Sequence, residues 1–137
     1  DEWSAAEVAN WADKIAALGI RTISLADTTG SANKEILGDL FEVIQHRLPH
    51  VELGVHLHAN PVECLDKVKA AFEHGCRRFD GALGGFGGCP MAKDELIGNI
   101  PSEIAFPWLI EKANRQFNHE MDWKALAAEA LLTYRTV

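Results

Sequence analysis

The sequence predicts an α/β fold in which short parallel strands alternate with helices. Three short segments, residues 22–27, 52–58 and 78–83, have the length of strands, and about half of their residues are apolar. A longer segment with apolar residues at helical spacing precedes each of them. Strands that are separated by helices in this way pair in parallel, with right-handed crossovers.

The first helix is predicted over residues 5–18. Ser4 is its expected N-cap, Glu7 completes a capping box, and Gly19 ends the helix. The remaining helices are predicted over residues 33–48, 61–74, 102–116 and 123–132. A glycine-rich loop, residues 84–99, separates the last strand from the last two helices.

The predicted sheet is small for a self-contained domain. Three parallel strands leave two unpaired edges, which natural proteins normally cover. Two architectures fit the pattern, an open three-layer sheet and a part of a barrel. The unpaired edges favour a part of a larger sheet, and the chain starts at Asp1 without an initiator Met.

Composition and charge exclude several classes of protein. With 137 residues and 47% hydrophobic residues, the chain suits one globular unit with a core. Its net charge of −7 argues against a nucleic-acid partner, and no apolar run is long enough to span a membrane. The three cysteines show no zinc-binding spacing and no disulfide framework, so we expect a reducing, cytoplasmic location.

A pair of histidines, His56 and His58, stands at the end of the second predicted strand. Residues two apart on a strand project from the same face, so the two imidazoles can share one metal ion. Functional groups also gather at the carboxyl ends of parallel strands. The alternative is one buried histidine with a backbone partner and one solvated histidine.

The glycine-rich loop carries a cysteine. Gly85, Gly87 and Gly88 allow positive φ angles and close approach of the backbone to a ligand, and Cys89 follows them directly. Cys64 and Cys76 fall on a helix face and at a helix–strand turn, where we expect packing thiols. Cys89 is therefore the candidate for chemistry, unless it is a loop thiol without a role.

Two further polar residues follow strand ends or loop ends. Asn99 can offer its carbonyl oxygen to a hard cation, or it can close the loop or cap a helix. Asp27 can orient a ligand histidine through its carboxylate, or it can serve a turn. All these candidates lie at the carboxyl ends of successive strands, so we expect them to converge on one pocket.

The motifs ISLADT (residues 23–28), VHLH (55–58) and GFGGCP (85–90), with Gly98-Asn99 and Glu103 after them, resemble the hydroxymethylglutaryl-CoA lyase family. They occur in that family's order and near its spacing. The glycine-rich Cys-Pro loop separates this family from the isopropylmalate, homocitrate and citramalate synthases, which share the HxH strand.

The resemblance implies a TIM (β/α)₈ barrel, of which about strands 6–8 are present. Residues 1–137 would form a single partial barrel domain, with 119–137 as a C-terminal helical extension. The implied cofactor is a divalent metal, Mg²⁺ or Mn²⁺, held by His56, His58 and Asn99. Cys89 and His56 would be catalytic, in the cleavage of a 3-hydroxyacyl-CoA to acetyl-CoA and a keto acid.

The chain departs from the family in ways that leave other functions open. Ala59 follows the second histidine where the family has Asp, and no strand carries the family's Arg-Asp pair. We therefore expect the isolated chain to be inactive and to associate with itself or with the missing N-terminal part. The alternatives are a related metal-dependent aldolase or acyl-CoA condensing enzyme, and a non-catalytic scaffold.

Overall fold

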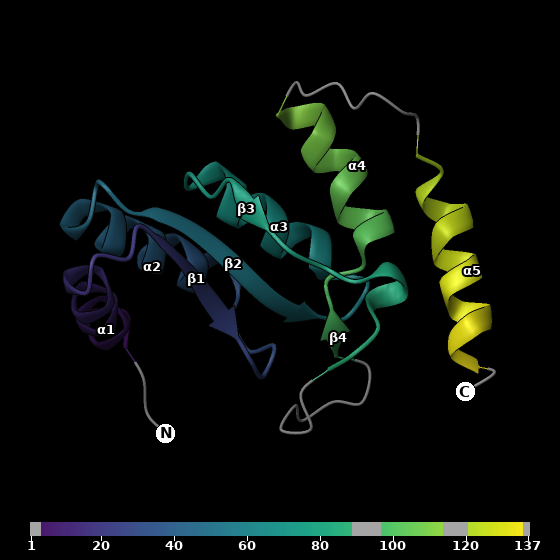
Figure 1. Ribbon diagram of the computed structural model, residues 1–137, viewed down its shortest axis with the longest axis horizontal. Helices are drawn as coiled ribbons and strands as arrows, with labels where there is room; N and C mark the ends of the chain where they lie inside the picture. Colours follow the sequence, from purple (N-terminus) through teal and green to yellow (C-terminus); the bar gives the residue numbers. More distant parts are fainter. Residues whose placement is uncertain (1–3, 89–96, 114–120, 136–137) are drawn as a thin grey trace.

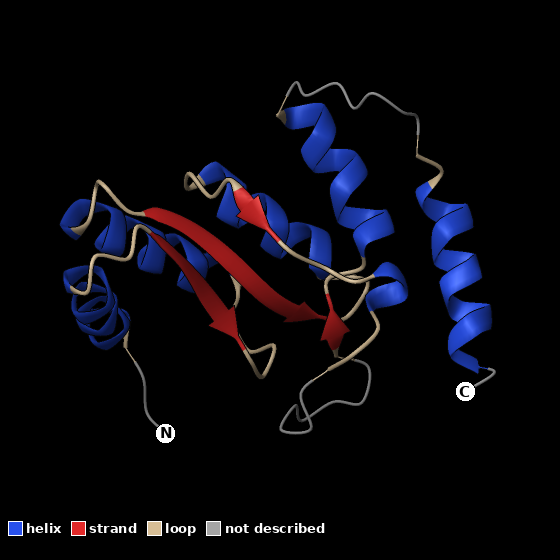
Figure 2. Cartoon of the chain, viewed as in Figure 1, coloured by secondary structure: helices blue, strands red, loops and turns tan. Residues whose placement is uncertain are grey.

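The computed structural model describes residues 4–88, 97–113 and 121–135. Three parallel strands form a twisted sheet in the order β1-β2-β3, with β2 in the middle (Figures 1 and 2). The strands are β1 (Thr22–Asp27), β2 (Glu52–Ala59), β3 (Arg78–Phe79) and β4 (Gly98–Asn99). The helices are α1 (Ala5–Ala17), α2 (Lys34–Arg47), α3 (Cys64–Glu73), α4 (Ser102–Lys112) and α5 (Trp123–Arg135), with a 3₁₀ turn, η1, at Leu83–Gly85.

The ends of the first two helices follow from local hydrogen bonds. The Ser4 hydroxyl accepts a hydrogen bond from the Glu7 amide at 3.2 Å, as the predicted cap requires. Asn33 caps α2 in the same way, through the Ile36 amide at 2.8 Å. Helix α3 begins later than predicted because the Asn60 side chain accepts from the Glu63 amide and holds the preceding residues in a turn.

Helices cover one face of the sheet, and the described residues leave the other face of β1 exposed. Along β1, Ile23 and Leu25 are buried, whereas Ser24 and Ala26 are exposed. The buried side packs on α2 and α3, where Phe41 is completely enclosed. Helices α1 to α4 contact one another in chain order along this face, and α5 contacts α4 (Figure 1). The arrangement is that of one sector of a larger barrel.

The third strand is shorter than predicted, and a fourth strand was not predicted. After Phe79 the chain leaves β2, and Ala82 exchanges hydrogen bonds with the returning segment, through the Ile100 carbonyl and the Ser102 amide, each at 3.0 Å. The loop returns as β4, which pairs antiparallel with the end of β2, His58 opposite Asn99. The pairing of β4 with β2 joins residues that are far apart in the chain, so no periodic pattern in the sequence predicts it.

No helix in the described part of the chain is long and apolar enough to cross a membrane. The cytoplasmic location remains a prediction. The assignment of residues 119–137 as an extension of the barrel also remains a prediction, although α5 accounts for most of that segment.

Candidate functional site

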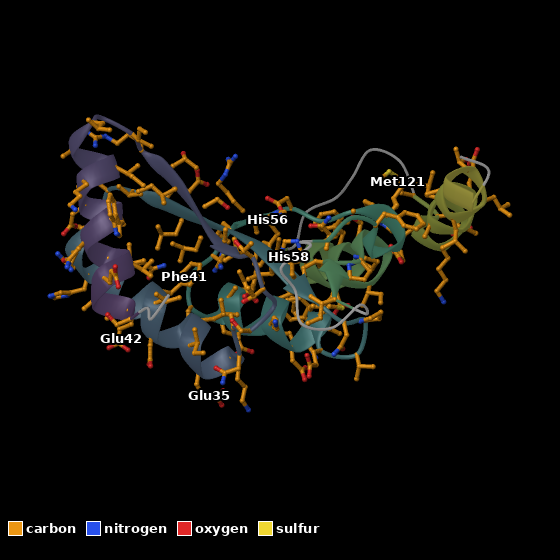
Figure 3. All side chains as sticks on the ribbon, turned by 90° about the horizontal axis from the view of Figure 1, so that it is seen from below. Glu35, Phe41, Glu42, His56, His58 and Met121 are labelled. Atoms are coloured by element: carbon orange, nitrogen blue, oxygen red, sulfur yellow. The ribbon has the colours of Figure 1, made fainter. Side chains whose placement is uncertain are left out.

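The site is built around the carboxyl end of β2, where the two histidines leave the same face of the strand. Their ring centroids lie 5.0 Å apart with the planes nearly perpendicular, and Figure 3 shows the two side by side. His58 is buried, with 6% of its surface exposed, whereas His56 is partly exposed toward the open face of the sheet. The predicted convergence of two imidazoles is confirmed.

Each imidazole is anchored through its Nδ1 atom. His58 Nδ1 lies 3.0 Å from the carbonyl oxygen of Asp27, and because a carbonyl only accepts, Nδ1 carries the proton. His56 Nδ1 lies 2.6 Å from Asp80 Oδ1. A neutral ring that donates from Nδ1 keeps a lone pair on Nε2, which is the form that binds a metal. In its neutral form, each histidine therefore has Nε2 as its free nitrogen.

Asn99 brings an amide oxygen to the same place. Strand β4 sets Asn99 opposite His58, and its Nδ2 donates a 2.7 Å hydrogen bond to the Phe86 carbonyl. Within the described residues, its Oδ1 is buried and accepts no hydrogen bond. A buried polar atom without a partner is costly, and a cation would remove that cost. Imidazole nitrogens and amide oxygens are donor types that bind divalent metals.

The described residues contain no group of three or more His, Cys, Asp or Glu side chains close enough to hold a metal. The donor set is thus two histidines and one amide, without a carboxylate. Mg²⁺ and Mn²⁺ favour oxygen ligands, so the remaining positions need oxygens from outside this set.

Of the two predicted roles of Asp27, its carboxylate has the second, in the turn after β1. Its carboxylate does not orient a histidine: Oδ2 accepts from the ammonium of Lys67 at 3.1 Å and from the Ala32 amide at 3.2 Å. The contact with His58 comes from the backbone carbonyl instead. The side chain of Asp27 points to the helix-covered side because residues alternate along β1.

Two residues of this site escaped the sequence analysis. Asp80 sits directly after β3 and hydrogen bonds to His56. An aspartate at the end of a parallel strand is the signal that could have identified it. Lys67 lies in the middle of α3, where a lysine usually faces water, so no sequence pattern marks it.

The start of the glycine-rich loop is held by a hydrogen bond from Gly84 to helix α4. Gly84, Gly85 and Gly87 have positive φ angles, which agrees with the prediction for Gly85 and Gly87, whereas Gly88 does not have one. Glu103, at the start of α4, accepts a hydrogen bond from the Gly84 amide at 3.0 Å and so ties the loop to the helix. Gly88 is also described, but Cys89 lies outside the described residues.

Gly98 is where the returning strand passes closest to the loop. A Cβ atom there would overlap the carbonyl oxygen of Gly85, a backbone atom that cannot rotate away. We expect Gly98→Ala to lower the free energy of unfolding by about 1–3 kcal/mol and to weaken Mn²⁺ binding, because β4 carries Asn99. Urea unfolding and Mn²⁺ titration measure the two effects.

Gly38→Ala is the matched control for this substitution. A Cβ atom at Gly38 would meet His74 Nε2 at 2.9 Å, a side-chain atom that moves away if the ring gives up its 2.8 Å hydrogen bond to the Ala70 carbonyl. Its effect on stability should stay within about 1 kcal/mol, since alanine also favours the helix. Equal losses of stability in the two variants would show that overlap with the Gly85 carbonyl does not determine the effect of Gly98→Ala.

Cys64 and Cys76 are buried free thiols, as predicted for packing residues. Burial raises the pKa of the Cys76 thiol to about 11, and burial also raises the pKa of Cys64. A raised pKa means that the folded chain holds a proton that the unfolded chain releases. The contribution of the Cys76 thiol to the free energy of unfolding is therefore complete below about pH 9, and it declines between pH 9 and about 11.

The raised pKa of Cys76 predicts that its thiol is alkylated slowly, because the thiolate is the reactive form. In the folded protein at pH 8, iodoacetamide should leave Cys64 and Cys76 unmodified, as measured by peptide mass spectrometry, while the urea-unfolded chain reacts at both. The Cys76→Ala variant should lose less stability than the unmodified chain between pH 9 and 11. Rapid labelling of Cys76 in the folded state would contradict this.

A family model described as HMGL-like matches residues 2–130, a range that contains both histidines and Asn99. This chain belongs to the HMGL-like family. Among curated proteins, the (R)-citramalyl-CoA lyase of Chloroflexus aurantiacus is 43% identical over 86 residues, which cover 63% of this chain and 27% of that protein. The mitochondrial hydroxymethylglutaryl-CoA lyase of Mus musculus is 34% identical over 100 residues, covering 73% and 30%.

Solved structures of HMG-CoA lyases superpose on the HMGL-like chain. The enzyme from Acinetobacter baumannii, in complex with coenzyme A and 3-methylmalate, is 34% identical with a TM-score of 0.75, covering 95% of this chain and 42% of that one. The enzyme from Brucella melitensis is 24% identical with a TM-score of 0.81, covering 98% and 47%, and it supports the fold.

The predicted fold class is confirmed: the strands and helices match part of the barrel of HMG-CoA lyases. The chain spans less than a third of these curated relatives and less than half of these solved structures. The predicted family is confirmed as well, at the level of HMGL-like proteins.

Proposed function

We propose that this chain provides the C-terminal part of a carbon–carbon lyase that cleaves a 3-hydroxy-3-methylglutaryl-CoA-like substrate to acetyl-CoA and a keto acid. The observation that carries the proposal is the donor set at the end of β2. Two imidazoles with protonated, anchored Nδ1 atoms stand beside a buried amide oxygen that lacks a partner among the described residues. Such a set serves a divalent metal better than it serves a packed core.

His56, His58 and Asn99 would hold the metal, which is Mg²⁺ or Mn²⁺ in this proposal. When bound, the cation would act as a Lewis acid on the hydroxyl and carboxylate oxygens of the substrate. The hydroxyl proton leaves to a base, the bond between C2 and C3 breaks, and the electron pair remains on C2 as the enolate of acetyl-CoA. Cys89 would protonate that enolate, which requires a tuned thiol pKa.

Asp80 supports the proposed acid–base role of His56. Its carboxylate lies 2.6 Å from Nδ1, so it fixes the ring and stabilises the charge that His56 gains on accepting a proton. Nε2 of His56 has one lone pair, so it would accept the hydroxyl proton only while it does not hold the metal, and Nδ1 stays anchored to Asp80 in either role.

The donor set needs completion by groups outside the described residues. The edge of β1 is unpaired among the described strands, and an apolar cavity of about 420 Å³ lies beside it, between α1, β1 and α2. Trp11 and Ile15 of α1 line this cavity, and Trp11 is 56% exposed. A preceding strand of the same barrel would cover both the edge and the cavity. We therefore propose association with an N-terminal part, or with a second copy.

The test is an assay of acetyl-CoA release with Mn²⁺ or Mg²⁺, using the chain alone and a longer protein that includes the preceding barrel strands. The substrates are 3-hydroxy-3-methylglutaryl-CoA and (R)-citramalyl-CoA. We expect turnover only in the longer protein, and full turnover by the chain alone would overturn the need for a missing part. Preference for 4-hydroxy-2-oxo acids would instead favour a related aldolase.

A scaffold without catalytic function is the remaining alternative. It predicts that the longer protein binds no Mn²⁺ and releases no acetyl-CoA from either substrate. Mn²⁺ binding without turnover would favour a related condensing enzyme, for which acyl-CoA and a keto acid are the substrates to add.

A further inference from the structure

Lys67 is a buried lysine directly behind the candidate metal ligands. Only 5% of its surface is exposed, although it stands in the middle of a helix. Its ammonium has three N–H donors and three acceptors: the Gly30 carbonyl at 2.8 Å, the His58 carbonyl at 2.9 Å and Asp27 Oδ2 at 3.1 Å. Burying a charge is costly unless it is paired and fully hydrogen bonded, and here both conditions are met.

These bonds close a ring that contains His58. The ammonium of Lys67 holds the backbone of His58 through its carbonyl oxygen. The same ammonium holds the carboxylate of Asp27, and the backbone carbonyl of Asp27 accepts the Nδ1 proton of His58. Lys67 thus fixes both the main chain that carries the imidazole and the residue that sets its tautomer.

We propose that Lys67 is a positioning residue that keeps His58 in the Nδ1-protonated form, with Nε2 directed for ligation. Lys67 stands on helix α3 and holds His58 through the hydrogen bonds of its ammonium. It does not contact the substrate or the metal. An alternative function for the same contacts is to attach α3 to the sheet, with no effect on the imidazole. The inference rests on the proposed function only where it assigns Nε2 of His58 to a metal ion.

The tautomer of His58 distinguishes these two roles without any metal. Long-range ¹H–¹⁵N NMR correlations at pH 8, assigned with His58→Gln, report which nitrogen carries the proton. We expect the Nδ1-protonated form in the unmodified protein. Lys67→Met should shift the population toward the Nε2-protonated form, which a free neutral imidazole prefers, and Lys67→Arg should preserve most of the original form.

Two further variants keep the test decisive. If Lys67→Met does not fold, Asp27→Asn/Lys67→Met removes both charges and retains the Asp27-position carbonyl that His58 contacts. Lys69→Met, at a partly exposed position of the same helix, is the matched control and should leave the tautomer unchanged. An unchanged His58 tautomer in folded Lys67→Met, or in the folded double variant, overturns the proposal.

A second readout links the tautomer to metal binding. Mn²⁺ titration of the longer protein, followed by electron paramagnetic resonance, should show an affinity about 10–100-fold lower for the Lys67→Met or double variant. If the unmodified protein binds no Mn²⁺, the proposed function fails while the tautomer measurement still decides the role of Lys67. A tautomer shift with unchanged Mn²⁺ affinity would overturn the positioning of Nε2 for ligation.

Discussion

Replacing both His56 and His58 by alanine is expected to abolish Mn²⁺ binding by the longer protein, with an affinity loss of about 100-fold or more. The two rings lie 5.0 Å apart and supply both nitrogen donors of the candidate site. Asn99 alone would leave a single amide oxygen, which does not hold a hard cation against water. Isothermal titration calorimetry with Mn²⁺ measures the loss.

The matched control is the double variant His46→Ala/His50→Ala, which removes two exposed histidines of the same chain. Its Mn²⁺ affinity should equal that of the unmodified protein. Asp80→Asn should give an intermediate result, a loss of about 10–100-fold, because it weakens the anchor of His56 and leaves both rings in place. Identical binding by the unmodified protein and the His56/His58 variant would end the metal interpretation.

The second large effect is expected from the buried pair of Lys67 and Asp27. Their side chains are only 6% and 7% exposed, and the ammonium lies 3.1 Å from the carboxylate. Lys67→Met leaves that carboxylate buried with only the Ala32 amide as a donor. The free energy of unfolding should fall by about 3–5 kcal/mol, as measured by urea denaturation followed by circular dichroism.

The double variant Asp27→Asn/Lys67→Met should recover much of this stability, since no unpaired charge remains. Lys69→Met provides the control, because its side chain is partly exposed and its ammonium lies 3.9 Å from Asp66, so its removal should cost less than about 0.5 kcal/mol. A loss below about 1 kcal/mol for Lys67→Met would mean that water reaches the pair.

Local features of the fold could be predicted because each depends on neighbours in the chain. The Ser4 cap needs only the Glu7 amide three residues on, and it forms as expected. The shared direction of His56 and His58 follows from the two-residue period of a strand. The order of helices and strands follows from apolar spacing alone, and it led to the correct fold class.

The tertiary structure decided which groups meet across long separations. Residues 78–83 read as one strand, but pairing of Ala82 with the returning chain ends β3 at Phe79. Asp80 meets His56 across 24 residues, and Asn99 reaches His58 through β4, which has no period of its own.

The sequence by itself determined the α/β alternation, the histidine pair and the resemblance to a lyase family, because local periodicity and short motifs encode them. Only the tertiary structure decided what surrounds the histidines: Asp80 on one ring, the Asp27 carbonyl on the other, and Lys67 beneath both Asp27 and His58. The physical reason is that a charge can be buried only where several distant acceptors converge on it, and that convergence is set by packing.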